Sequence, residues 1–405
     1  MSLQEALGIV IIGVCGLLGV WVVGQRTRTL AAALVSFVLH LTLAVAILLK
    51  VGLFSPDALH YDAQAQQLSD GSTQIAVTSG KEGWPLLLSI LYRIFGHSPV
   101  LGLLVNAIAA ALTVCVLAQA AHRLTLPRRA TAWIFALLPT TLFWSSLLLR
   151  ESLTWLFMAI VLFALSGLVT HRSSLREMMI FAIGLAGLLA FRGTVAILMA
   201  ASGLAAIVLS RNRVRGIAIS IVMIALVSVP GPVATKFDAI IGIYTPEHLN
   251  ASRTALARTG STAFGTSVTD LQSAQSAIPR VLPRVLLGPF PWEWGAVGIP
   301  FALDGVLWCM ILFLAIRGWH RHADRRQLLV ALVPAAALLV ALAITSGNYG
   351  TMVRLRLQAT VLIIPLAAAG LTRLCPHFVG TKPVPQRTLG EQSETTVAGE
   401  SDADT

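Results

Sequence analysis

The amino-acid sequence predicts an all-α membrane protein, a bundle of about eleven transmembrane helices with no separate soluble domain. Hydrophobic residues make up 56% of the 405 residues, and the mean hydropathy of +0.80 is well above that of ordinary soluble domains. Several apolar runs reach about 18 residues, enough to cross a hydrocarbon core of about 30 Å. The short segments of alternating polarity that a transmembrane β-barrel needs are missing from the sequence.

The predicted spans are separated by polar loops, and one shorter apolar segment lies between the second and third spans. That segment, Pro85–Phe95, is too short to cross the bilayer, so we expect it to lie along the surface or dip into it. The eleven spans are Ala6–Val23, Ala31–Leu53, Val100–Ala121, Ala132–Leu149, Ser152–Val169, Met178–Phe191, Thr194–Leu209, Ile217–Val229, Phe301–Ile316, Leu328–Thr345 and Gln358–Leu374.

The distribution of arginine predicts how these spans are oriented. Cytoplasmic loops carry an excess of Lys and Arg, and one orientation of the bundle places every arginine-rich loop inside. That orientation puts the N-terminus outside, the C-terminus inside and the loops 54–99 and 230–300 outside. It also accounts for the net charge of +11 without nucleic acid as a partner. The arginine-rich loops are residues 26–28, 123–129, 172–176, 211–215 and 317–326, followed by the C-terminal tail.

The chain has no recognisable second domain. We take residues 1–379 as one transmembrane domain and expect residues 380–405 to form a disordered cytoplasmic tail, because this tail is polar and becomes acidic. The four cysteines lie in or beside apolar segments, at no spacing typical of a metal site. No internal repeat of the kind found in many transporters is evident.

The first outer loop is unusually polar for a chain with only 12% charged residues. Residues 57–68 show helical spacing of apolar positions, and Ser55 with Pro56 supplies an N-cap and a first-turn proline. Asp57 would then lie at the start of a short helix, as either a cap or a reactive group. Asp62 lies five positions later and projects about 140° away, so both carboxylates are not expected to face one substrate hydroxyl.

Four arginines on the outer side are candidates for binding phosphate, because guanidinium groups form bidentate hydrogen bonds to it. Arg192 interrupts an almost continuous apolar run, where a charge is costly unless it is paired or functional. Arg150 and Glu151 could instead be a capping pair. Arg354 and Arg356 are two residues apart and diverge by about 200° on a helix, so we expect Arg354 in the turn and Arg356 at the helix start. Anchoring to lipid headgroups is the alternative for Arg354 and Arg356, and snorkelling to the membrane surface is the alternative for Arg150 and Arg192.

Two features of the later chain are weaker candidates. Asp304 is an acid within an apolar run, so it is either functional or the partner of an arginine. Trp292 and Glu293 lie in a Trp-Glu-Trp sequence, which is typical of the aromatic belt at a membrane surface but also suits the binding of sugar.

Several segments together resemble the membrane glycosyltransferases of the GT-C superfamily, and within it the bacterial phospholipid-carrier-dependent enzymes. These segments are the acid of the first outer loop, WPLLLSILYRIFG from Trp84, LLPTTLFWSSLLLRESL from Leu137, GPFPWEW from Gly288 and GNYGTMVRLRLQ from Gly347. The likeness covers most of residues 57–374. The sequence departs from the family pattern in lacking an adjacent Asp-Asp or Asp-Glu pair and a large soluble domain, and in having an extra first span.

The resemblance implies a GT-C-like fold in the bacterial plasma membrane, and transfer of a sugar from a polyprenyl-phosphate donor to a lipid- or glycan-linked acceptor outside the cell. In this family an acid of the first outer loop acts as base or positions the acceptor. The matching residue is Asp57, with Asp62 second. A divalent cation such as Mg²⁺ or Mn²⁺ could assist, although no set of ligands is visible. The remaining candidates for substrate binding are His60, Tyr61, Lys81, Glu82, Glu151, Trp292, Glu293, Asp304 and Asn348.

Two other functions remain open. A polymerase or ligase that joins lipid-linked oligosaccharides would use the same outer arginines to bind pyrophosphate but would depend less on Asp57. A lipid or solute transporter would place polar residues near the middle of the bilayer on several helices, whereas here they gather at one face.

Overall fold

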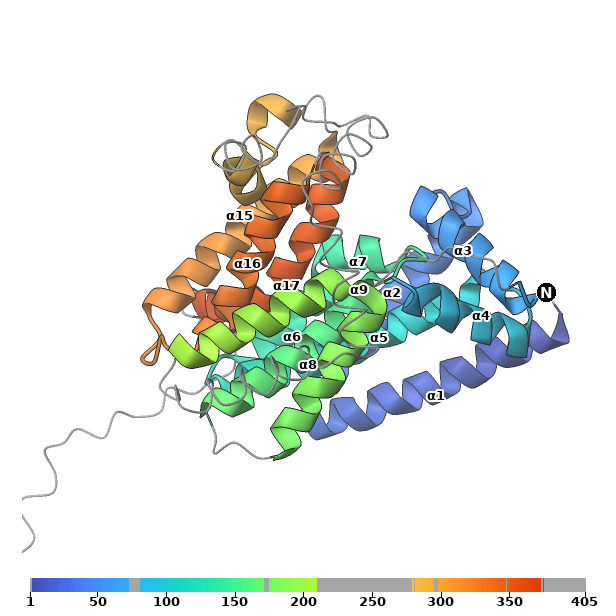
Figure 1. Cartoon of the computed structure of the whole chain (residues 1–405), viewed down its shortest axis with the longest axis horizontal. Helices are drawn as coiled ribbons and strands as arrows, with labels where there is room; N and C mark the ends of the chain where they lie inside the picture. Colours follow the sequence, from blue (N-terminus) through green and yellow to red (C-terminus); the bar gives the residue numbers. More distant parts are fainter. Residues whose placement is uncertain are drawn as a thin grey trace, which may run out of the picture.

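The structure is a computed structural model that describes residues 2–72, 81–170, 175–209, 279, 281–294, 298–346, 348–372 and 374. Over these residues the chain is mostly helical and has no strands, which confirms the predicted all-α class (Figure 1). Within the same part of the chain, seven helices are long and apolar enough to cross a membrane. They are α1 (Leu3–Thr27), α2 (Leu30–Val51), α5 (Pro99–Arg123), α8 (Glu151–Thr170), α9 (Leu175–Leu209), α15 (Ile299–His320) and α17 (Tyr349–Thr372).

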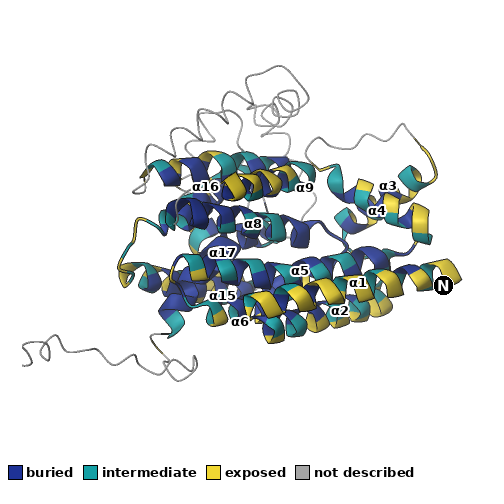
Figure 2. Ribbon diagram, turned by 90° about the horizontal axis from the view of Figure 1, so that it is seen from below, coloured by how far each residue is buried: buried dark blue, intermediate teal, exposed yellow. Residues whose placement is uncertain are grey.

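The shorter elements lie between these helices in the order of the chain. They are α3 (Pro56–Ser69), α4 (Gly83–Phe95), α6 (Arg128–Leu137), α7 (Pro139–Ser145), η1 (Pro291–Glu293) and α16 (Leu329–Thr345). The centre of the bundle is formed by α5, α8 and α17, which are mostly buried, whereas α1 and α2 keep exposed apolar faces at its edge (Figure 2). Exposed apolar faces of this kind are expected on helices that face lipid.

The segment predicted to be too short to cross the bilayer is the amphipathic helix α4. Trp84, Leu88 and Tyr92 on one face are buried against α3 and α5. Leu86 and Ile90 on the opposite face are exposed. This pattern is expected of a helix that lies at a membrane surface.

The prediction of one span over Ala132–Leu149 is wrong. The chain forms α6, breaks at Leu138 and continues as the seven-residue α7. Pro139 causes the break, because proline lacks an N–H donor and forces the residue before it out of the helical region. Leu138 accordingly has φ −66° and ψ 116°, which is extended backbone. Neither helix is long enough to cross a membrane.

The two spans predicted on either side of Arg192 are the two arms of α9. The backbone of Arg192 is not helical (φ −157°, ψ 77°), so the helix changes direction there and its arms diverge (Figure 1). The break therefore falls beside the turn that Gly193 and Thr194 predicted.

Helix α17 begins earlier than predicted, at Tyr349 instead of Gln358. Arg354 therefore lies inside the helix, and its prediction as a turn residue is wrong. Asn348 explains the early start, because its side-chain oxygen accepts a hydrogen bond from the backbone N–H of Thr351 at 2.7 Å and caps the helix.

The remaining predictions about organisation fall on other parts of the chain. The span Ile217–Val229, most of the loop 230–300 and the tail 380–405 lie outside the described residues. Each of the other seven predicted spans corresponds to one helix of the structure: α1, α2, α5, α8, α15, α16 and α17.

Candidate functional site

The turn between α7 and α8, residues 146–150, is buried although it is not helical. Its backbone carbonyl groups therefore need partners within the protein. Asn106 on α5 supplies them, because its amide donates to the carbonyl oxygens of Leu147 and Leu149 at 2.9 and 2.8 Å. Between these two residues, the carbonyl oxygen of Leu148 lies 3.4 Å from the indole nitrogen of Trp84. Helices α4 and α5 thus hold the turn in place where α8 begins.

Glu151, the first residue of α8, brings three helices together. Arg192 Nη1 donates to both of its carboxylate oxygens, at 2.9 and 2.8 Å, and Arg354 Nε lies 3.5 Å from one of them. The break in α9 allows Arg192 to reach inward, and Gln358 on α17 can accept from Arg192 at 3.0 and 3.1 Å. Glu151 and Arg192 are both buried, so these contacts are shielded from water.

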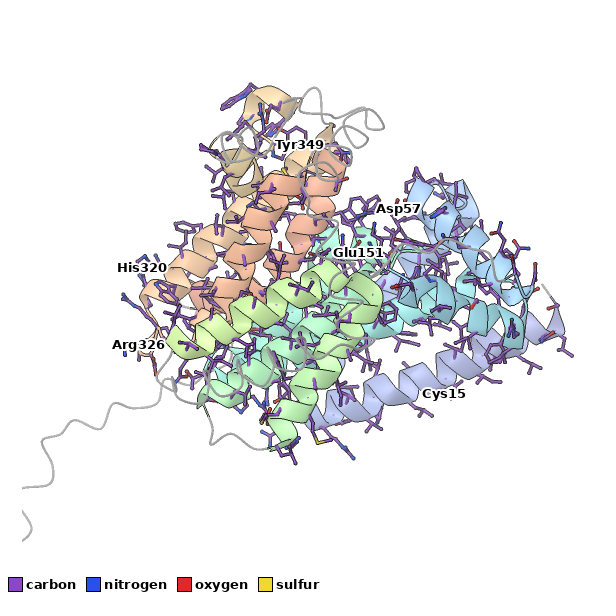
Figure 3. The ribbon with its side chains drawn as sticks, in the orientation of Figure 1. Cys15, Asp57, Glu151, His320, Arg326 and Tyr349 are labelled. Carbon is purple, nitrogen blue, oxygen red and sulfur yellow. The ribbon has the colours of Figure 1, made fainter. Side chains whose placement is uncertain are left out.

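Arg354 extends the cluster to α3, in the segment between α2 and α5. Its Nη1 donates to Asp57 Oδ2 at 2.5 Å, and its guanidinium lies 5.9 Å from the ring centre of Trp144. The Asp57 side chain is 47% exposed, whereas that of Arg354 is 17% exposed. Figure 3 shows Asp57 and Glu151 at the same end of the bundle. Asp57 is therefore the carboxylate of this cluster that is open to solvent.

Arg150 lies in the same cluster but has no hydrogen-bond acceptor among the described residues. It is 4% exposed, its Nη1 is buried without a partner, and its guanidinium lies 5.8 Å from the ring centre of Tyr61. A buried charge without hydrogen-bond partners is costly, and binding of an anion would remove this cost. Arg150 is therefore the group in this cluster that is best prepared to receive an anion.

We call Asp57, Lys81, Arg150, Glu151, Arg192 and Arg354 the cationic cluster. It holds four basic side chains and two acidic ones, which leaves an excess of two positive charges. Partial burial, together with the nearby Arg150, Arg192 and Arg354, lowers the pKa of Lys81 to about 8. Burial and the field of Arg192 lower the pKa of Arg150 to about 10. Burial alone would raise the pKa of Asp57, but Arg354, Arg150 and Lys81 outweigh it and hold this pKa below its usual value.

Asp62 has a different environment from Asp57. Its carboxylate accepts a hydrogen bond from the hydroxyl of Tyr92 at 2.6 Å, and His97 Nε2 lies 3.1 Å from both of its oxygens. The two acids on α3 thus contact separate groups, as their angular separation predicted. Asp62 fastens α3 to α4 and to the start of α5.

Arg356 is held in a second, separate cluster. Its Nη2 donates to Asp304 Oδ2 at 2.5 Å and its Nη1 to the carbonyl oxygen of Gly288 at 2.6 Å, while its guanidinium lies 5.2 Å from the ring centre of Trp308. Thr140 donates to the other oxygen of Asp304 at 2.8 Å. The sequence left Asp304 as either a functional residue or the partner of an arginine, and the structure shows it as the partner of an arginine.

The Trp-Glu-Trp segment is fastened to the start of α17. Glu293 accepts hydrogen bonds from Arg284 Nε and from the backbone N–H of Phe290, both at 2.9 Å, and from the hydroxyl of Tyr349. Trp292 is 77% exposed and stacks on Phe290. Glu293 therefore has a clear structural role, and Trp292 remains an exposed aromatic surface.

The other predicted residues lie around α3 and α4. Tyr61 is buried beside Arg150, His60 is exposed, and Glu82 is half-buried at the start of α4. The described residues contain no group of three His, Cys, Asp or Glu side chains that could hold a metal ion. Both carboxylates of the cationic cluster are also engaged with arginines, so this donor set does not fit a divalent cation.

Three residues of the site were missed by the sequence prediction: Asn106, Trp144 and Gln358. Asn106 is a lone amide within an apolar run, and a polar group inside a membrane helix usually has a specific partner, so that signal was available. Gln358 was visible as a polar residue one helical turn after Arg354. Trp144 carried no distinguishing signal, because aromatic residues are frequent in apolar segments.

Comparison of the chain with protein-family models, with curated proteins and with solved structures finds no match. What the described residues show is a helical bundle with seven candidate spans and a largely buried cationic cluster at one end.

Proposed function

We propose that the protein is a membrane glycosyltransferase of the GT-C type, which moves a sugar from a polyprenyl-phosphate donor to an acceptor hydroxyl on the outer face of the bacterial plasma membrane. The observation that carries this proposal is the cationic cluster. Among the described residues it places two excess positive charges, one arginine without a hydrogen-bond acceptor and one half-exposed carboxylate in a single site. The acceptor is a lipid- or glycan-linked sugar in this proposal.

Binding of the donor phosphate uses the arginines. The Nη1 of Arg150 has no hydrogen-bond partner in the part of the chain that the structure describes, and Arg354 is held by carboxylates on two sides, so a phosphate oxygen can bind between them. Arg192 donates from Nη1 to both carboxylate oxygens of Glu151, and its role is to keep that carboxylate in place. Charge-assisted hydrogen bonds from fixed arginines stabilise the phosphate most when its negative charge increases, which happens as the sugar leaves.

Asp57 is the base of the proposed reaction. The acceptor oxygen forms a bond to the anomeric carbon of the sugar, and the proton of its hydroxyl passes to Asp57. The bond between that carbon and the phosphate oxygen breaks, and its electron pair stays on the phosphate. A low pKa makes Asp57 a weak base in the free protein, but a phosphate on Arg354 offsets the field that lowers it. The base therefore becomes stronger when the donor is bound.

Asp57 is favoured over Asp62 because of what each carboxylate contacts. Asp57 touches an arginine of the cationic cluster and keeps nearly half of its side-chain surface exposed. Asp62 is held by Tyr92 and His97 away from those arginines, and its side chain is 16% exposed. The half-buried ring of Trp144 beside Arg354 offers an aromatic face for the transferred sugar.

One observation also favours a ligase or polymerase that acts on lipid-linked oligosaccharides. Two excess positive charges match a pyrophosphate at least as well as a single phosphate. In that case the arginines carry the reaction and Asp57 contributes little, so the same variants separate the two functions.

The decisive experiment is an assay of the purified protein in proteoliposomes with polyprenyl-monophosphate and polyprenyl-diphosphate sugars. Release of the carrier monophosphate with transfer of one sugar supports the proposal, whereas release of a carrier diphosphate supports the ligase. No release from any donor would contradict both.

The proposed side of the membrane is tested separately in intact cells. Ser72 lies at the exposed end of the α3 region, and a Ser72→Cys variant should react with a membrane-impermeant thiol reagent added outside. Labelling only after the membrane is permeabilised would show that the cluster does not face outward.

A further inference from the structure

A large apolar groove lies on the side of the bundle, away from the cationic cluster. It has a volume of about 580 Å³ and runs between α6, α15 and α17. We call it the lateral groove; its lining includes Arg129, Trp133, Leu137, Met310, Ile311 and Leu371. Its volume is within the range of about 300–1,000 Å³ that is usual for ligand sites.

The lateral groove lies between α6 and α15 and extends past the end of α6. Helices α6 and α15 both pack against α17, and α6 stops at Leu137, before Pro139. Leu137 and Met310 on the two walls are each about half exposed, at 49% and 51%. The groove is therefore open sideways, where the surrounding medium of a membrane protein is lipid.

One end of the lateral groove is basic. Arg129 in the first turn of α6 is exposed and lines the groove. Arg317 lies on α15 three residues after Leu314, which lines the groove, so both project from the same side of the helix. The Nε of Arg317 is buried and has no hydrogen-bond partner among the described residues. No side chain caps the N-terminus of α6, which leaves N–H groups that also suit an anion.

We propose that the lateral groove binds an anionic phospholipid, with one acyl chain along the apolar walls and the phosphate between Arg129 and Arg317. The arrangement of an apolar slot and a cationic rim matches the two chemical parts of such a lipid. Basic pockets between helices on the cytoplasmic side of membrane proteins bind anionic headgroups, and the arginine distribution predicts that this end is cytoplasmic.

The same phosphate cannot serve the cationic cluster. Thr372, which lines the basic end of the groove, lies eighteen residues after Arg354 on α17. At a rise of about 1.5 Å per residue, the two positions are about 27 Å apart along the helix axis. The groove is therefore a second lipid site, independent of the proposed donor site.

Native mass spectrometry of the detergent-purified chain tests this proposal with two lipids that share their acyl chains, palmitoyl-oleoyl phosphatidylglycerol and palmitoyl-oleoyl phosphatidylcholine. We expect saturable binding of one phosphatidylglycerol, in preference to phosphatidylcholine. Arg129→Gln should weaken phosphatidylglycerol binding about fivefold, because one arginine near a headgroup contributes about that much. Met310→Trp should reduce the binding of both lipids, because it fills the groove from a position that is already half exposed.

Arg326→Gln is the matched control, since Arg326 is an exposed arginine at the same basic end but does not line the groove. Melting temperatures of all variants show that they are folded. Three results would overturn the proposal: equal loss in Arg326→Gln, unchanged phosphatidylglycerol binding in Met310→Trp, or displacement of the lipid by equimolar polyprenyl phosphate.

Discussion

Arg354 and Arg356 lie two residues apart on the same helix, yet their surroundings differ in kind. Arg356 is 1% exposed, and Asp304 and the carbonyl of Gly288 accept from its two terminal nitrogens. Arg354 belongs to a cluster with more cations than carboxylates, next to a carboxylate that is half exposed and to an arginine that has no acceptor in the described part of the chain. In the first cluster the arginine is matched by a carboxylate and a carbonyl oxygen. In the second, the positive charges outnumber the negative ones.

This difference separates a structural ion pair from a candidate reactive site. A buried charge whose hydrogen bonds are all made within the protein has no capacity left for a substrate. A cluster with unmatched charge and an exposed acid remains able to bind and to exchange a proton. Both arginines were equal candidates in the sequence, and the count of their partners distinguishes them.

The largest expected effect is on turnover, when Asp57 is changed. Asp57→Asn preserves the shape but cannot take a proton, so turnover in the transfer assay should fall about 10²- to 10⁴-fold with little change in donor affinity. Stability should change little, because an ion pair with a half-exposed partner contributes at most about 1 kcal/mol. Asp62→Asn is the matched control on the same helix. Full activity of Asp57→Asn would remove the proposed base.

The cluster of Asp304 and Arg356 should respond in the opposite way, with a loss of stability. Asp304→Asn leaves Arg356 buried without a counter-charge, so the free energy of unfolding should fall by about 3–5 kcal/mol. Thermal unfolding in detergent measures this loss, with Asp57→Asn as the comparison. A melting temperature of Asp304→Asn equal to that of the unchanged protein would show that this pair is not the structural one.

Arg150 sharpens the comparison because it has no hydrogen-bond acceptor to lose among the residues that the structure describes. Arg150→Gln should weaken donor binding about tenfold to a hundredfold, since a charge-assisted hydrogen bond to phosphate is lost. Its melting temperature should stay the same or rise, because an unpaired buried charge is removed. Arg150→Lys should restore binding only in part, because an ammonium lacks the planar fork of a guanidinium. Unfolding of Arg150→Gln with unchanged donor affinity would assign Arg150 to the structure instead.

The sequence predicted the elements better than their assembly. Long apolar runs located α1, α2, α5, α8 and α15 correctly, since burial and lipid exposure both need them. Pro139 was visible, but the apolar run around it suggested a continuous span. The polar start of α17 concealed its first turns, because the helix is recognised there only through the cap at Asn348.

The pairing of Asp57 with Arg354 could not be predicted, since 297 positions separate them and no local pattern relates them. The angular relation between Arg354 and Arg356 was predictable from helix geometry alone. This relation predicts that the two arginines face different partners. The structure confirms the prediction, because Arg354 and Arg356 belong to different clusters. Local geometry therefore gave the directions of these side chains, whereas their partners depend on the packing of distant helices.

The smallest expected effect is on the pH dependence of the reaction. Lys81 has a pKa of about 8, so raising the pH above this value removes one of the two excess positive charges of the cationic cluster. We expect kcat/KM for the anionic donor to fall up to about fivefold above pH 8, the effect of one partly exposed charge. Lys81→Met should give a lower value of kcat/KM that no longer falls in this range. A fall that persists in Lys81→Met would assign it to another group.

The acidic side of the same profile reports on Asp57. Its pKa is held below the ordinary value, so in the free protein the carboxylate remains ionised, and kcat/KM should stay level, down to below about pH 4. Donor phosphate on Arg354 and Arg150 weakens the field that lowers this pKa, so in the complex the pKa is higher. The acidic fall in kcat should therefore occur at a higher pH than the fall in kcat/KM, because kcat reports the complex and kcat/KM the free protein. Coincident acidic limbs would mean that the bound phosphate does not contact the arginines that hold Asp57.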